Sequence, residues 1–192
     1  ANVWNLTGWF DQPAIADGML LSQNLYDNQI YCFGKGPTAT TVTAPMVAVT
    51  EGTAALLQGS VTDQSPSAKG AAAESETDMK AWMEYLYEQQ PLSGHTVTGV
   101  PVSIDAVDPN GNYVHMGDAT SDGTGQYSLK WDVPLVPGMY TVVASFAGST
   151  SYWPSHAETH LVVSAAPAAT APPQYPQPID YTMHFVYAIV IL

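Results

Sequence analysis

Alternation of apolar and polar residues is the feature that most constrains the fold of this chain. It is clearest at residues 100–106, 127–132 and 140–146, where every second residue is apolar. A period of two gives each strand one apolar and one polar face. Gly, Asn, Asp and Pro separate these segments, as is typical of turns between antiparallel strands. The pattern predicts an all-β chain built around an antiparallel β-sandwich.

The sandwich is expected to span residues 38–165, after a Gly-Lys-Gly-Pro junction at residues 34–37. Strands are predicted at residues 40–49, 53–62, 97–107, 113–116, 125–133, 138–146 and 158–163. Pro137-Gly138 directly precedes Tyr140, the arrangement of a tyrosine corner. Tyr140 is therefore predicted to be buried at a strand start, near Trp131, with its hydroxyl bonded to backbone a few residues upstream. The segment from Pro137 onward resembles Ig-like modules of cell-surface proteins, which implies an Ig-like sandwich.

Composition excludes some classes of function. The chain has 17 acidic residues against 4 Lys or Arg, a net charge of −13, so it would repel the phosphates of nucleic acid. Its single cysteine, Cys32, excludes a disulfide within the chain.

Residues 1–37 have a different pattern, with strands expected at 3–6, 19–24 and 29–33. Turn signals stand between them at Asp17-Gly18 and Asp27-Asn28. The unit resembles the repeat of pyrroloquinoline-quinone-type β-propellers, in which a strand opens after Asp-Gly and the next ends in a sequence such as Ile-Tyr-Cys-Phe. The resemblance implies the last blade of a truncated propeller, since one blade cannot bury both faces of its sheet. The alternative is a β-hairpin extension packed on the sandwich.

An insertion at residues 66–95 interrupts the sandwich. Ser75 to Asp78 has the spacing of a capping box, and an apolar stripe comes after it at Met79, Trp82, Met83 and Leu86. This predicts one amphipathic helix of about 13 residues that ends before Pro91. The stripe either covers an open edge of the sandwich or docks a partner.

The composition changes again after the sandwich. Residues 166–178 are rich in Ala and Pro, which predicts an extended stalk. Residues 179–192 are apolar after Asp180 and are expected to begin a transmembrane helix. A C-terminal β-strand is the alternative for this last segment.

Two groups of residues could bind a metal ion. His156, Glu158 and His160 share one face of a predicted strand, which is also what plain exposed surface would show. Asp108, Asn110 and Asn112 have the oxygen spacing of a calcium loop, which Asp118 and Asp122 could complete. The Pro-Asn-Gly sequence is first of all a hairpin turn, however, so no metal site is predicted at either place.

No catalytic motif stands out, and neither an enzymatic activity nor a cofactor is predicted. Asn5-Leu6-Thr7 is a glycosylation sequon, meaningful if this segment is exported.

The order of blade, Ig-like module, Pro-rich stalk and terminal helix resembles archaeal cell-surface proteins. The resemblance implies the C-terminal fragment of an extracellular, membrane-anchored protein that presents a propeller for adhesion or scaffolding, with protein or glycan ligands. The alternative is the membrane-tethering part of a quinone-dependent propeller dehydrogenase.

Overall fold

The computed structural model describes residues 5–92, 94, 97–134 and 136–168. In chain order, its elements are β1 (Phe10–Ala16), β2 (Met19–Asn24), β3 (Gln29–Phe33), β4 (Thr38–Thr43), β5 (Val49–Thr50), β6 (Ala54–Asp63), α1 (Met79–Glu88), β7 (Pro101–Val107), β8 (Tyr113–Thr120), β9 (Gln126–Asp132), β10 (Gly138–Phe146) and β11 (Ser155–Ser164). The prediction of an all-β sandwich with a short helical insertion is confirmed.

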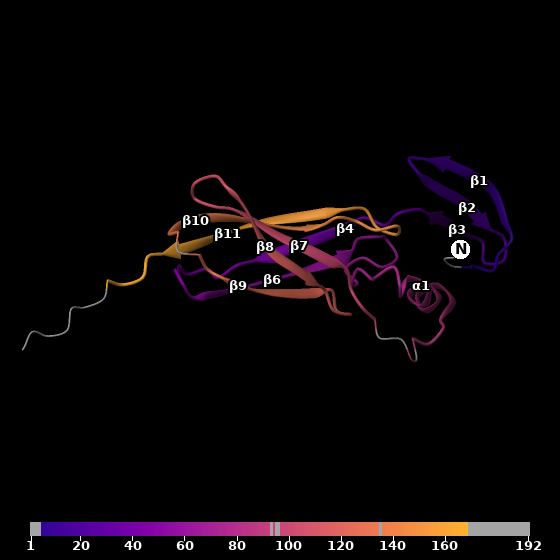
Figure 1. The fold of residues 1–192 in the computed structure, drawn as a ribbon. Coiled ribbons are helices and arrows are strands. Elements are labelled where there is room, and N and C mark those ends of the chain that lie inside the picture. The colour runs from indigo at the N-terminus through magenta and orange to yellow at the C-terminus, as the bar shows by residue number, and fades with distance from the viewer. Residues whose placement is uncertain (1–4, 93, 95–96, 135, 169–192) are drawn as a thin grey trace, which may run out of the picture.

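Two sheets form the sandwich (Figure 1). One has five strands in the order β5-β11-β10-β7-β8, and the other has three in the order β4-β6-β9. Their pairing is antiparallel except between β5 and β11, which run parallel. The inward residues of both sheets form one core, which includes Leu57 and Val61 of β6 and Val142 and Ala144 of β10, all fully buried. The alternation in the sequence therefore encodes the sandwich directly.

The prediction of a single continuous strand at residues 40–49 is wrong. It divides into β4 in the three-stranded sheet and β5 in the five-stranded sheet. Pro45 and the fully exposed Met46 lie in the break. Proline has no amide hydrogen to donate to a ladder, so the chain leaves one sheet there and joins the other.

Tyr140 forms the predicted corner at the start of β10. It is 1% exposed, and its hydroxyl donates a hydrogen bond of 3.0 Å to the carbonyl oxygen of Val136. Its ring lies edge-on to that of Trp131, with 5.6 Å between the ring centroids. The contact joins the two sheets, because Trp131 belongs to β9.

The N-terminal strands form a separate antiparallel sheet, β1-β2-β3, at one end of the sandwich and close to α1 (Figure 1). β2 and β3 have the predicted bounds. Half of the strand expected at 3–6, Val3 and Trp4, lies outside the described residues; its other half, Asn5 and Leu6, is in no strand, and β1 begins at Phe10. A bulge with a positive φ at Gln12 lets Pro13 sit inside β1, because an edge strand tolerates a missing donor.

The insertion folds onto the same end of the sandwich. α1 is shorter than predicted, and Ser75 does not cap it, since the N-cap residue is Asp78. The Asp78 carboxylate instead accepts hydrogen bonds from the backbone amide and hydroxyl of Thr98. Met79 is buried, and Trp82 and Met83 pack against the core. This part of the apolar stripe therefore packs against the end of the sandwich (Figure 1).

The chain enters and leaves the sandwich at opposite ends (Figure 1). It enters beside the start of β11, where the Gly36 amide donates to Ser151 and the Thr38 hydroxyl donates to Ser155. It leaves after Ser164, whose carbonyl accepts from the amide of Glu51. The ten residues of β11 separate these points by about 30 Å.

The stalk and the anchor fall almost wholly outside the described residues, which stop at 168. None of the helices in the described part of the chain has the length and hydropathy of a membrane span.

Candidate functional site

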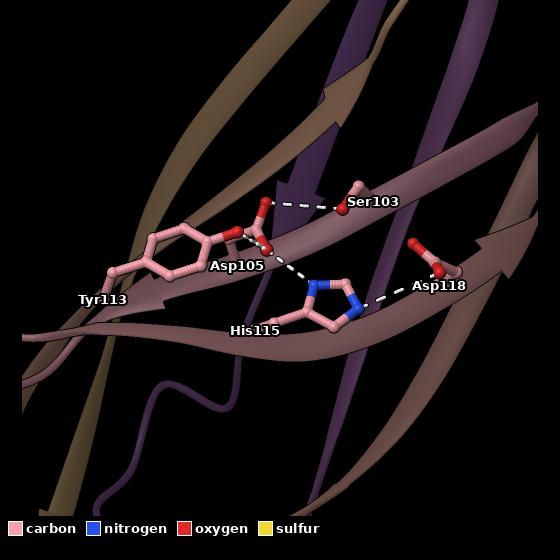
Figure 2. Close-up of polar contacts among 5 residues, drawn as sticks. All are labelled: Ser103, Asp105, Tyr113, His115 and Asp118. Atoms are coloured by element: carbon pink, nitrogen blue, oxygen red, sulfur yellow. Dashed lines mark hydrogen bonds and ion pairs between the residues drawn. The ribbon is translucent and has the colours of Figure 1, made fainter.

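A polar cluster on the outward face of the five-stranded sheet is the candidate site (Figure 2). We call it the Asp105 cluster; its members are Ser103, Asp105, Tyr113, His115 and Asp118. One oxygen of Asp105 accepts from the Tyr113 hydroxyl at 2.5 Å and lies 2.7 Å from His115 Nδ1. The other accepts from the Ser103 hydroxyl at 3.3 Å. On the far side of the imidazole, Nε2 lies 3.8 Å from an oxygen of Asp118.

A β-bulge assembles this cluster. Asp105 pairs with His115 across the β7–β8 hairpin, but the next pair is Ile104 with Gly117, which leaves Met116 as an extra residue. Met116 points into the core, and the extra residue reverses the alternation after it. His115 and Asp118, three residues apart, therefore lie on the same face. Gly117 adopts φ +144°, a conformation that favours glycine.

Hydrogen bonds set the charges of the Asp105 cluster. Partial burial alone would raise the pKa of Asp105, but the hydrogen bonds from Tyr113 and His115 outweigh it and lower that pKa. The bond to Asp105 raises the pKa of His115 above its ordinary value. It raises the pKa of the Tyr113 hydroxyl as well. The cluster is therefore an ionised carboxylate that holds an imidazole in one orientation.

This arrangement does not activate a nucleophile. In a Ser-His-Asp triad, the serine hydroxyl donates to the histidine nitrogen remote from the carboxylate. Here the Ser103 hydroxyl donates to Asp105 itself, and His115 Nε2 faces Asp118. The side chains of His115 and Asp118 are 49% and 73% exposed. The site offers a nitrogen and a carboxylate open to solvent, which suits binding of a cation.

His156, Glu158 and His160 stand on β11, on the outward face of the same sheet, and all three are exposed. Their positions on alternate residues match the prediction of a shared face. The His160 imidazole lies 3.5 Å from the Thr141 hydroxyl. Among the described residues, no group of three or more His, Cys, Asp or Glu side chains is placed to hold a metal ion.

Asp108, Asn110 and Asn112 form the turn between β7 and β8. One oxygen of Asp108 accepts from the backbone amides of Asn110 at 2.8 Å and Asn112 at 2.7 Å. These bonds and the Asn112 side-chain amide lower the pKa of Asp108. Asp122 caps another turn, accepting from the amides of Thr124 and Gln126. The structure thus does not gather these residues with Asp118 in one loop site.

A buried acidic residue, Glu74, lies at the end of the sandwich that the insertion covers. It is fully buried, and within the described part of the chain neither of its carboxylate oxygens has a hydrogen-bond partner. Burial, and next the charge of Asp78, raise the pKa of Glu74 to about 7. Nearby, the buried Tyr152 hydroxyl donates to the buried Asp63 carboxylate at 3.3 Å.

Sequence reasoning missed both Glu74 and the Asp105 cluster. The sequence held a signal for part of the cluster. If Pro-Asn-Gly is taken as the middle of a hairpin turn, Asp105 and His115 lie opposite each other on the two strands, both facing outward. The bulge that adds Asp118 had no such signal.

Comparisons with known proteins do not identify the chain. No family model matches it, and no curated protein matches it. Among solved structures, a tetra-tandem repeat from the extending region of a large adhesion protein is 16% identical over 76% of this chain and 30% of that chain, with a TM-score of 0.40.

Two other solved structures are similarly distant. The fibronectin(III)-like modules of Clostridium thermocellum CbhA are 11% identical over 82% of this chain and 66% of that chain, with a TM-score of 0.38. A Salmonella alpha-2-macroglobulin mutant is 15% identical over 81% of this chain and 9% of that chain, with a TM-score of 0.39. Such low scores assign the chain to none of these groups of proteins.

Proposed function

We propose that this chain is a non-catalytic, extracellular structural module that holds a preceding β-propeller away from a membrane. The observation that carries the proposal is the position of the chain ends. The polypeptide enters the sandwich beside Ser155 and leaves it after Ser164, at the other end of β11. A module with this layout adds about 30 Å between the segment on its N-terminal side and the segment on its C-terminal side.

The N-terminal sheet supports the propeller part of the proposal. Ile15 is 79% exposed and Ile30 is 75% exposed, and they lie on opposite faces of the sheet. Phe10, Tyr31 and Phe33 form an aromatic cluster on the face that carries Ile15. Apolar side chains on both faces are what a sheet between two neighbouring sheets would carry, as a propeller blade does.

Surface chemistry supports an exported location. The net charge of −13 keeps the chain solvated, and Asn5 of the glycosylation sequon is exposed. In this proposal the ligands of the presented propeller are proteins or glycans, and the segment at 179–192 is the membrane contact.

The location can be tested in the natural host. An epitope tag would be inserted between Asn110 and Gly111, in the exposed β7–β8 turn of the protein expressed from its own complete gene. We expect antibody to label intact cells. Labelling only after permeabilisation would overturn the proposal.

The spacing can be tested separately by electron-spin distance measurements. Spin labels on Pro37→Cys and Ala165→Cys, in a Cys32→Ser background, are expected to lie about 30 Å apart plus the label arms. A separation below about 15 Å would mean that the chain enters and leaves at one end, which would exclude a spacer.

An activity assay tests the alternative of a quinone-dependent dehydrogenase. The intact protein would be loaded with pyrroloquinoline quinone and given alcohols or sugars with an artificial electron acceptor. No turnover is expected, and substrate-dependent reduction of the acceptor would contradict the non-catalytic function.

A further inference from the structure

We propose that His115 Nε2 and the Asp118 carboxylate form a surface site for a divalent transition-metal ion of the zinc and copper class. The inference rests on the geometry of the Asp105 cluster and is independent of the proposed function. The metal would occupy the space between the imidazole and Asp118 in Figure 2.

The separation of the two ligand atoms suits one ion. His115 Nε2 and Asp118 Oδ2 lie 3.8 Å apart. Bonds from zinc to a histidine nitrogen and a carboxylate oxygen are each about 2.0–2.2 Å long, about 4.2 Å together. An ion slightly off the line between the two atoms therefore contacts both without a change in the backbone.

Asp105 acts as a positioning residue for His115. Metal-binding histidines commonly donate their other ring N–H to a carboxylate, which fixes the ring and makes the binding nitrogen more basic. Asp105 Oδ1 lies 2.7 Å from His115 Nδ1 and the Tyr113 hydroxyl donates to that same oxygen, so the carboxylate is itself held in place. Nε2 is consequently the nitrogen available to a metal.

The bulge at Gly117 gives the site its second ligand. In a regular strand, Asp118 would lie on the opposite face from His115 and would point into the core. The extra residue at Met116 brings both ligands to the solvent side. Two protein ligands leave the remaining coordination positions to water, so the site is open.

Protons compete with the metal for this site. Asp105 raises the pKa of His115, and Nε2 binds a metal ion only when it carries no proton. Affinity should therefore increase as pH rises through the raised pKa of His115 and level off above it.

The test is a titration of the 192-residue chain with Cu²⁺ alone, tracked by paramagnetic broadening in two-dimensional ¹⁵N–¹H NMR spectra. We expect broadening centred on residues 103–118 and competition by Zn²⁺. His115→Gln should abolish it, and Asp118→Asn should weaken binding. The matched control is the pair His156→Gln and His160→Gln, which removes two exposed histidines from the same face and should leave the broadening unchanged.

The Asp105→Asn variant tests whether Asp105 positions His115 or only stabilises the fold. It should lower the affinity by about 10- to 100-fold while the spectrum stays dispersed. It should also lower the pKa of His115, measured from imidazole chemical shifts, an effect that loss of packing alone would not produce. Broadening that persists in His115→Gln, or that is centred on residues 156–160, would overturn the proposal, as would the absence of broadening in the unaltered chain above the pKa of His115.

Discussion

The hydroxyl of Tyr140 donates a 3.0 Å hydrogen bond to the carbonyl oxygen of Val136, four residues upstream, while its ring packs edge-on against Trp131. One side chain thus fixes the path of the chain into β10 and joins the two sheets. The rings of Tyr140 and Trp131 are both buried, and the hydrogen bond to Val136 is partly buried.

Removing only the hydroxyl isolates the hydrogen bond. Tyr140→Phe should lower the free energy of unfolding by about 1 kcal/mol, and Tyr140→Ala by about 3–5 kcal/mol because a cavity is added. Urea unfolding monitored by tryptophan fluorescence measures both. The control is Tyr26→Phe at a position 70% exposed, and a cost for Tyr140→Phe no greater than for this control would contradict the role.

Glu74 should make stability depend on pH. Its pKa is about 7 in the folded chain against an ordinary value of 4.5, so the folded state binds the proton more tightly. The contribution of Glu74 to stability is therefore fully present below pH 4.5. As pH rises from 4.5 to 7, the free energy of unfolding should fall by up to about 3 kcal/mol, and it should not recover above pH 7.

Glu74→Gln tests this dependence, because a neutral side chain does not titrate. The variant should remove the loss of stability between pH 4.5 and 7, measured by urea unfolding at a series of pH values. Glu158→Gln, at an exposed position on β11, is the matched control and should leave the loss in place. An unchanged pH profile in Glu74→Gln would mean that this carboxylate is not responsible.

Gly117→Ala should destabilise the β7–β8 hairpin. A residue with a Cβ is strained at φ +144°, and that Cβ would lie 3.3 Å from Leu129 Cδ1. A loss of about 1–3 kcal/mol in unfolding free energy is expected. Gly111→Ala is the control, since a Cβ there meets nothing among the described atoms within 4 Å although φ is also positive. Equal losses in the two variants would show that packing against Leu129 is unimportant.

The exposed faces of the N-terminal sheet should be dispensable for folding of this chain. Ile15→Lys and Ile30→Lys each change a side chain that is at least 75% exposed, so the unfolding free energy should change by less than about 0.5 kcal/mol. Phe146→Ala in the core is the control and should cost about 3–5 kcal/mol. A large loss in either lysine variant would mean that the sheet is covered in solution.

Short-range patterns predicted much of this fold. The bounds of β2, β3 and β10 match the predicted ranges, because Gly and Asp turn signals delimit each alternating segment. β1 escaped prediction because its Pro13 argues against a strand, and only its position at a sheet edge makes that proline acceptable.

Only part of the candidate site can be read from the sequence. Alternation places Asp105 on the outward face, but its contact with Tyr113 and His115 results from the register of a hairpin. Asp118 joins them only because one extra residue reverses the alternation, and predicted strand 113–116 stopped short of that point. Burial of Glu74 results from how the insertion folds back on β6, where Ala73 donates to the carbonyl of Val61.

The two ends of the sandwich also determine how it would respond to mechanical tension. At one end of the sandwich, Gly36 pairs in parallel with Tyr152. At the other end, β5 pairs in parallel with the end of β11. A pull between residue 36 and residue 164 therefore acts along the strands. It loads the ladder between β10 and β11 in shear, so that its nine aligned pairs share the force instead of opening one at a time.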